Sequence, residues 1–209
     1  FPGQVLLVPG DLTDHLQVRE IGMTIAQSWG ALDTVILSAG TCEYVDVSQF
    51  DARVIERSVC TNLLASSYCI ESALPLLRAG RTPHLVGVVS AVTTSPQRRA
   101  QAFGASKSGL RYLLESLRVD LADEGIDVTL VSPGFVDTSQ AQNNAHGGHR
   151  HWPASKAASY ICQQLLKRPR EIVFPTRFLK LLNFLTTLPK RLHLALAKRL
   201  TGTQGETSL

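Results

Sequence analysis

The sequence predicts an α/β protein built on a doubly wound parallel sheet. Short runs of consecutive apolar residues alternate along the chain with longer segments of helical periodicity. Strands that are apolar at successive positions are buried on both faces, which is typical of parallel sheets covered by helices. Right-handed crossovers between such strands give a doubly wound sheet, whose ligands bind beyond the carboxyl ends of the strands.

Five apolar runs predict the strands of this sheet. They comprise residues 4–8, 33–40, 84–90, 126–134 and 171–174. The segments between them predict three helices. The first ends near Trp29, the second runs from about Asp51 to Leu77, and the third covers 102–124.

The helix expected over 102–124 has the clearest pattern. Its apolar positions, at i, i+3, i+4, i+7 and i+11, are Leu110, Leu113, Leu114, Leu117 and Leu121. They form one buried face, and Gly125 stands where a C-terminal cap is expected.

Composition restricts the class of protein. A chain of 209 residues with 44% apolar and 18% charged residues forms one large domain without needing disulfides. The four cysteines are scattered, which predicts free thiols and a cytoplasmic location. From residue 167 onward nine Lys and Arg face two Glu, so the basic charge belongs to the tail and no nucleic-acid partner is expected.

The residues that directly follow the strands are the first candidates for a site, because they share one edge of the sheet. They are Asp11, Ser38, Ala39, Gly40, Ser90, Pro133 and Gly134.

With these residues the chain resembles the short-chain dehydrogenase/reductase family over about residues 4 to 175. The segment "GDLTD" resembles the family's adenine-contacting motif at Asp11, and "LSAG" retains Ala39 and Gly40 of its Asn-Asn-Ala-Gly signature, with Ser38 replacing an asparagine. The segment "SPGFVDT" resembles its Pro-Gly motif. The cofactor-binding residues that the resemblance implies are Asp11, Ser38, Ala39, Gly40, Lys107, Pro133, Gly134 and Thr138.

The resemblance also implies a Rossmann-like fold and a catalytic set. Ser90 and Lys107 match the family's serine and lysine, and Asn62 in "CTNLLAS" matches its helix asparagine. In the family, the serine hydrogen-bonds the carbonyl oxygen and a tyrosine donates the proton. The lysine lowers the pKa of that tyrosine and holds the nicotinamide ribose, and the asparagine fixes a water behind the lysine.

Phe103 occupies the position of the family's tyrosine, one helical turn before Lys107 and thirteen residues after Ser90. A phenyl ring preserves packing but donates no proton, a step worth about 10²–10⁴ in rate. Natural loss of activity, a mechanism that uses Ser90 or a water, and an engineered substitution all agree with the sequence. In an unrelated helix, Phe103 would be a plain core aromatic.

The family's Gly-rich phosphate-binding turn does not occur in this sequence. The run at 4–8 resembles the family's third strand, so the first two strands are expected to be missing and the chain to be a fragment. The cofactor is expected to be NAD or NADP, with NADP slightly favoured. The residues that discriminate between the two are expected at the end of the missing second strand and are therefore not part of this sequence.

Two of the cofactor candidates have a plain structural alternative. Asp11 contacts adenine or caps the following helix, for which Asp14 is the more natural N-terminal residue. Ser38 bonds the strand backbone or is an ordinary strand-end serine.

The segment 143–153 contains His146, His149 and His151, but no carboxylate or cysteine stands at metal-ligand spacing. We therefore expect no metal site. The family places a mobile substrate lid here, which would make His151 and Trp152 the expected substrate contacts.

We expect two parts, a domain over 1–174 and a basic amphipathic helical tail over 175–209. The tail predicts peripheral membrane contact through 175–200, or a helical hairpin that covers the substrate pocket or a dimer partner.

The first functional hypothesis is an NAD(P)-dependent oxidoreductase that interconverts a carbonyl and an alcohol on a small, apolar or lipid-like substrate. The second is a non-catalytic member of the family that acts in nucleotide binding, oligomerisation or membrane association. Family members commonly pair through the helices expected at 51–77 and 102–124, so a homo-oligomer is the default expectation.

Overall fold

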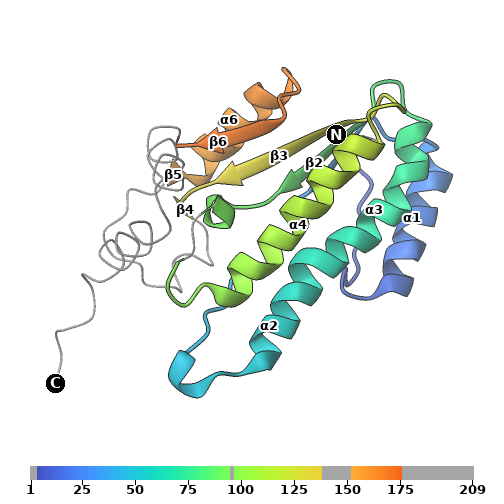
Figure 1. Cartoon of the computed structure of the whole chain (residues 1–209). Helices are drawn as coiled ribbons and strands as arrows, with labels where there is room; N and C mark the ends of the chain where they lie inside the picture. Colours follow the sequence, from blue (N-terminus) through green and yellow to red (C-terminus); the bar gives the residue numbers. More distant parts are fainter. Residues whose placement is uncertain (1–3, 95–96, 138–151, 176–209) are drawn as a thin grey trace.

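The computed structural model describes residues 4–94, 97–137 and 152–175, and its centre is a four-stranded parallel sheet (Figure 1). In spatial order the strands are β1 (Thr34–Leu37), β2 (His84–Val88), β3 (Asp127–Pro133) and β6 (Glu171–Phe174). All three neighbouring pairs are parallel. The predicted parallel α/β class is confirmed, and four of the five expected strands are present.

Helices fill the connections between these strands. They are α1 (His15–Trp29), α2 (Ala52–Val59), α3 (Ala65–Arg78), α4 (Gln101–Asp120) and α6 (Ala154–Leu165). A π-helical turn, η2 (Cys60–Leu64), joins α2 to α3, so the helix expected over 51–77 is continuous with one widened turn. The short elements are η1 (Val47–Gln49), η3 (Ala91–Thr94), β4 (Val136–Asp137) and β5 (Trp152–Pro153).

Helices lie on both faces of the sheet, as the continuously apolar strands predict, but β1 is incompletely covered, since Ile36 is 53% exposed. In Figure 1 α3 and α4 cross one face, and α6 lies on the other beside β6. Successive strand residues point to opposite faces, so Leu85 and Leu130 join the core under α4, whereas Val86 and Val131 pack with α6. The leucine stripe of α4 supplies Leu110 and Leu114 to the first core, as predicted.

The start of α1 settles which aspartate caps it. The Asp14 carboxylate accepts hydrogen bonds from the backbone N–H groups of Leu16 (2.9 Å) and Gln17 (3.3 Å), as expected of an N-cap residue. At the far end of α4, Gly125 has a φ of +70°, but it stands in the turn before β3, beyond the C-cap Leu121. Gly125 therefore permits a left-handed turn but does not cap the helix itself.

The strand predicted at 4–8 is wrong. Residues 4–8 form no strand, and Val5 and Leu7 are 67% and 85% exposed. A strand needs a neighbour to satisfy its N–H and C=O groups and to bury its side chains. Among the described residues no segment pairs with 4–8, because β1 ends the sheet on this side and pairs only with β2. An apolar run alone does not supply that neighbour.

Other expectations fall partly within the described residues. All four cysteines are free thiols, as predicted. Within the described ranges no helix is both long and apolar enough to span a bilayer. Apart from Pro175, the tail predicted over 175–209 lies outside the described residues, as do His146, His149 and His151.

Gly87 in β2 is expected to tolerate no side chain. A Cβ at this position would collide with Cδ1 of Leu114, which is completely buried in α4. We predict that Gly87→Ala destabilises the fold by about 1–3 kcal/mol, the usual effect of overpacking a core, measured as the free energy of unfolding in urea.

Gly104 in α4 provides the matched control. A Cβ there meets no atom within 4 Å, so Gly104→Ala adds the same methyl without a clash. It should stabilise the helix by roughly 1 kcal/mol. Equal effects of the two substitutions would contradict the close packing of α4 on β2.

Candidate active site

The candidate site lies at the carboxyl ends of β1 and β2, where α4 begins to cross the sheet. The arrowheads of β2 and β3 point toward the same end of the molecule in Figure 1. Gly40 follows β1, Ser90 follows β2, and Pro133 ends β3. The edge of the sheet that strand topology predicts for ligands is thus the edge that carries these residues.

Lys107 reaches this edge from α4. The residue is only 4% exposed, and its Nζ donates a hydrogen bond to the backbone oxygen of Val88 at 2.8 Å. Burial lowers the pKa of Lys107 from 10.5 to about 8, opposed by the nearby Cys42 thiol. The ammonium therefore lies at the end of β2 with a proton that is held less firmly than usual.

Asn62 and Lys107 converge on Gly40. A Cβ placed on Gly40 would lie 3.0 Å from Asn62 Oδ1 and 3.0 Å from Lys107 Nζ. The absence of a side chain at residue 40 is what lets the amide and the ammonium approach the same stretch of backbone. Two of the three predicted polar groups thus meet at one point.

The side chain of Asn62 is held by the protein itself. Its Oδ1 accepts from Thr41 N (2.8 Å), and its Nδ2 donates to Thr41 O (3.0 Å) and to Ser106 Oγ (2.8 Å). Ser106 Oγ in turn donates to the backbone oxygen of Phe103 at 3.0 Å. Asn62 lies in the π-helical turn η2, an irregularity that is frequent at functional sites.

Ser90 lies between β2, which ends at Val88, and η3, which begins at Ala91. Its Oγ accepts a weak hydrogen bond from Val92 N at 3.3 Å. Because Lys107 bonds Val88, two residues earlier, Ser90 stands at the same end of the strand. The hydroxyl and the ammonium are therefore presented at the same end of β2.

Phe103 lies in the first turn of α4, four residues before Lys107 and on the same face of the helix. The ring is half-buried. It offers no hydrogen-bonding atom, so this position contributes shape and apolar surface only.

The predicted cofactor-binding residues lie further apart than the group formed by Asn62, Lys107 and Gly40. Asp11 is exposed, and its Oδ1 accepts from Thr13 N (2.8 Å) and Thr13 Oγ1 (2.7 Å), which lowers the pKa of the carboxyl. Ser38 and Ala39 are exposed at the end of β1. Gly134 N donates to Phe174 O at 2.8 Å, tying the Pro-Gly turn to β6. Thr138 lies outside the described residues.

The structure also places two residues at the site that the sequence reasoning missed. Cys42 and Tyr44 affect each other's pKa, and the charge of Lys107 opposes the effect of burial on the pKa of the Cys42 thiol. Burial raises the pKa of Cys42 and raises that of Tyr44 to about 12. Both residues follow Gly40 closely, so the strand-end rule that selected Gly40 could have found them.

Of the two predicted substrate contacts, Trp152 lies within the described residues. Trp152 packs against Tyr160 and Phe174, with ring centroids 5.6 and 5.2 Å away, and Lys156 Nζ lies 4.5 Å from its ring centroid. Over the described part of the chain, no group of three or more His, Cys, Asp or Glu could hold a metal ion. His151 lies outside the described residues.

Known proteins share both this fold and stretches of this sequence. Residues 2–148 match the family model described as short chain dehydrogenase. An uncharacterised oxidoreductase of Staphylococcus aureus strain MW2 is 28% identical over 135 residues, which cover 65% of this chain and 58% of the relative. One of Staphylococcus epidermidis strain ATCC 35984 is 23% identical over 159 residues, covering 76% of this chain and 69% of that protein.

Solved structures of known proteins have a similar fold. The complex of Pseudomonas aeruginosa RhlG with NADP has 25% identity and a TM-score of 0.62, covering 65% of this chain and 55% of that one. ElxO with NADP bound has 26% identity and a TM-score of 0.60 over the same shares. A short chain dehydrogenase of Burkholderia cenocepacia J2315 has a TM-score of 0.77 at 20% identity, covering 92% of this chain and 77% of that chain.

The parallel sheet with helices on both faces is a Rossmann-like fold. Since the family model covers most of the chain, the protein belongs to the short-chain dehydrogenase family. The chain spans 58% of the length of the S. aureus relative.

The burial of Lys107 predicts a pH-dependent stability. Its pKa falls from 10.5 in the unfolded chain to about 8 in the fold, so the folded state disfavours the ammonium. Below pH 8 this burial opposes folding by up to roughly 3 kcal/mol. The penalty disappears between pH 8 and 10.5, where the unfolded state still binds the proton and the folded state has lost it.

Lys107→Met should therefore stabilise the protein at pH 7, and the gain should shrink as the pH approaches 10. Urea unfolding at both pH values measures it, with the exposed Lys167→Met as the control for loss of one charge. A Lys107→Met effect that stays constant from pH 7 to pH 10 would show that the ammonium is not destabilised by burial.

Proposed function

We propose that this chain carries the active site of an NAD(P)-dependent oxidoreductase that interconverts a carbonyl and an alcohol. The observation that carries the proposal is the approach of Asn62 Oδ1 and Lys107 Nζ to Gly40 at the edge where Ser90 also stands. Membership of the short-chain dehydrogenase family and the NADP bound by two structural neighbours support it.

The residues present fit a nicotinamide cofactor at this edge. Gly40 brings its backbone close to the buried ammonium of Lys107, and a cationic group beside backbone N–H groups suits a ribose and its phosphates. The residues that would hold the cofactor are Asp11, Ser38, Ala39, Gly40, Lys107, Pro133, Gly134 and Thr138. The bound cofactor would supply or accept the hydride. We favour NADP slightly over NAD, in line with those two neighbours.

The chain's own residues act on the substrate oxygen. Negative charge builds on that oxygen as the carbonyl is reduced. The Ser90 hydroxyl, which lies just beyond the end of β2, would donate to it. The charge of Lys107, little screened because the residue is buried, would stabilise the same oxygen and hold the ribose. The hydrogen bonds of Asn62 hold the loop after β1 next to the start of α4, and so keep the site in one geometry.

Phe103 would make the substrate-binding site more apolar. A phenyl ring in place of a phenol presents only apolar surface beside Ser90 and Lys107, which favours an apolar or lipid-like carbonyl compound. In ElxO, a tyrosine-to-phenylalanine variant was solved with NADPH bound. Such an exchange is therefore compatible with cofactor binding in that protein, and we carry this compatibility over to Phe103.

The second candidate is a non-catalytic family member that binds nucleotide, a second copy of itself or a membrane surface. Phe103 favours this alternative, because the family's proton donor is absent. The basic segment 175–200, which supports peripheral membrane contact, lies outside the described residues. Homo-oligomer formation remains the family expectation.

Phe103→Tyr separates the two candidates. Restoring the hydroxyl one turn before Lys107 should raise kcat for carbonyl reduction by about 10²–10⁴-fold, measured as NADPH oxidation over a panel of apolar ketones and aldehydes. NADPH binding, followed by its fluorescence, should be unchanged.

Phe50→Tyr is the matched control, since it adds the same hydroxyl to an exposed ring on another part of the chain and should not alter the rate. If the Phe103→Tyr protein binds NADPH and reduces none of the panel, the oxidoreductase proposal fails and the non-catalytic alternative is preferred.

A further inference from the structure

Two of the described residues have a positive φ without being glycine, and both are arginines. Arg99 has a φ of +62° and Arg168 has a φ of +47°. A left-handed backbone brings Cβ close to the following carbonyl oxygen, so glycine adopts it freely and a residue with a side chain only at an energetic cost. An arginine in this conformation therefore needs a reason, either in the contacts of the fold or in a function.

The fold itself explains Arg168. Its guanidinium pairs with the Asp127 carboxylate, with 2.6 Å between Nη1 and Oδ2, and its Nη2 donates to the backbone oxygen of Thr82 at 2.8 Å. These contacts join the turn before β2 to the start of β3. The Arg168 side chain is therefore structural.

Arg99 makes no contact of this kind. Its backbone oxygen accepts from Val45 N at 3.0 Å, but every residue type would offer the same oxygen. Its guanidinium carbon lies 5.8 Å from the centroid of the Tyr44 ring, a contact that occupies none of the N–H donors. The side chain at residue 99 thus contributes little to the fold in return for the strained backbone.

No ion pair neutralises the charge at this position. Arg99 acts on Asp46, but the Asp46 Oδ1 already accepts from the backbone N–H and the hydroxyl of Ser48. Over the part of the chain that the structure describes, no carboxylate forms an ion pair with Arg99 or with its neighbour Arg98, and both arginines are exposed. Two adjacent guanidinium groups therefore keep their charge and their donors for a ligand.

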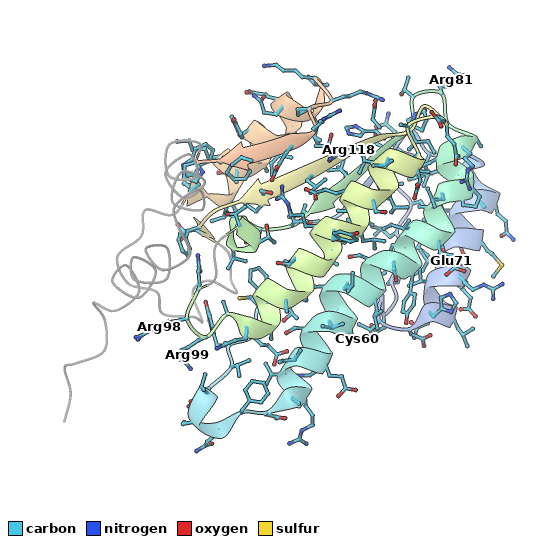
Figure 2. The ribbon with its side chains drawn as sticks, viewed as in Figure 1. Cys60, Glu71, Arg81, Arg98, Arg99 and Arg118 are labelled. Atoms are coloured by element: carbon cyan, nitrogen blue, oxygen red, sulfur yellow. The ribbon has the colours of Figure 1, made fainter. Side chains whose placement is uncertain are left out.

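Both arginines stand at the rim of the candidate site. They come just before α4, whose first turn carries Phe103. The hydrogen bond from Val45 N to Arg99 O ties them to the loop after β1, which Asn62 also holds. Figure 2 shows Arg98 and Arg99 together at the end of the molecule where α4 begins. A ligand seated at the site can therefore extend along the start of α4 to these two cations.

We propose that Arg98 and Arg99, which we call the cationic rim, bind an anionic group of the substrate. Because Phe103 stands between Arg99 and Lys107 along α4, the substrate class is an apolar carbonyl compound that carries a carboxylate or a phosphate. The proposal rests on the proposed oxidoreductase function. It also accounts for the strained arginine, since glycine at residue 99 would relieve the backbone but remove a cation.

Guanidinium groups suit both anions. One arginine can donate two parallel N–H bonds to the oxygens of a carboxylate or a phosphate, and such charge-assisted bonds are stronger than neutral ones. The ring of Tyr44 is a positioning group, because it lies against Arg99 without neutralising it. The anion can be the carboxylate of a fatty-acid derivative or the phosphate of an ester, and the experiment compares these two sources.

Binding is tested first, without turnover. Decanoate, decyl phosphate and the neutral decanol are titrated into the unmodified chain by calorimetry. The double substitution Arg98→Gln with Arg99→Gln should weaken binding of the anions by about 10–100-fold through loss of charge-assisted hydrogen bonds, and should leave decanol binding unchanged. The anion that binds the unmodified chain more tightly identifies the source.

Arg81→Gln is the matched control, because Arg81 is an exposed arginine at the opposite end of the molecule (Figure 2). It should leave the affinity for both anions unchanged. Decanol bound as tightly as the anions, or anions bound equally by the double variant, would overturn the proposal. A loss of NADPH affinity in the double variant as large as the loss of anion affinity would assign the rim to the cofactor and overturn it too.

Arg99→Gly distinguishes a ligand-binding residue from a structural one. Glycine relieves the left-handed backbone, so the urea midpoint of unfolding should rise while the affinity for the anion falls. Arg168→Gly is the control, since it relieves the same backbone conformation but loses the ion pair with Asp127, and its midpoint should fall. An equal fall in both variants would make Arg99 structural and overturn the proposal.

Kinetics in the Phe103→Tyr background separates this proposal from the oxidoreductase function. The preference for a medium-chain keto acid over its methyl ester, as a ratio of kcat/KM values, should fall about tenfold in the double variant, through KM for the acid. An active protein without this preference overturns the cationic rim and leaves the oxidoreductase function standing. Inactivity on both compounds with NADPH bound overturns the oxidoreductase function, and with it the assignment of the anion as a substrate group.

Discussion

The geometry of the site depends on the buried amide of Asn62. Its three hydrogen bonds join the loop after β1 to the first turns of α4, through Thr41 on one side and Ser106 on the other. A buried amide left without such partners would be strongly unfavourable, so the arrangement is formed as a unit or not at all. The π-helical turn η2 is where this amide leaves the helix, between α2 and α3. The positions of Gly40, Cys42 and Lys107 relative to one another therefore follow from one side chain.

The second constraint is the ammonium of Lys107, which is buried next to the end of β2. Its ammonium donates to a neutral carbonyl, Val88 O, so the charge is only partly compensated. Burial therefore dominates its pKa and lowers it to about 8. The Cys42 side chain shifts the pKa of this lysine upward, which connects the loop after β1 to α4 electrostatically as well as through Asn62.

Periodicity predicted four strands and the helices up to about residue 124, because buried parallel strands and a leucine stripe produce patterns within the local sequence, but α6 (Ala154–Leu165) was not predicted. Asp14 was recognisable as a cap because its carboxylate bonds backbone N–H groups two and three residues later. The run at 4–8 was not predictable in this way, since pairing depends on a neighbouring strand and not on its own residues. Cys42 was missed for a related reason, because its electrostatic interaction is with Lys107, which is 65 positions further along the chain.

The polar groups around Phe103 are retained although the family's tyrosine is replaced. A fold kept only for packing or for association would gain by replacing Lys107 with an apolar residue, since an incompletely paired buried charge opposes folding. It would also have no need of a widened helical turn that directs an amide toward the start of α4. Both features are present around Phe103, and Ser106 bonds the backbone oxygen of Phe103 itself. Because a phenyl ring lacks only the hydroxyl of a phenol, the surrounding amide, ammonium and serine keep their geometry. The energetic cost of that geometry supports the proposed site at the end of β2 over a fold kept only for packing.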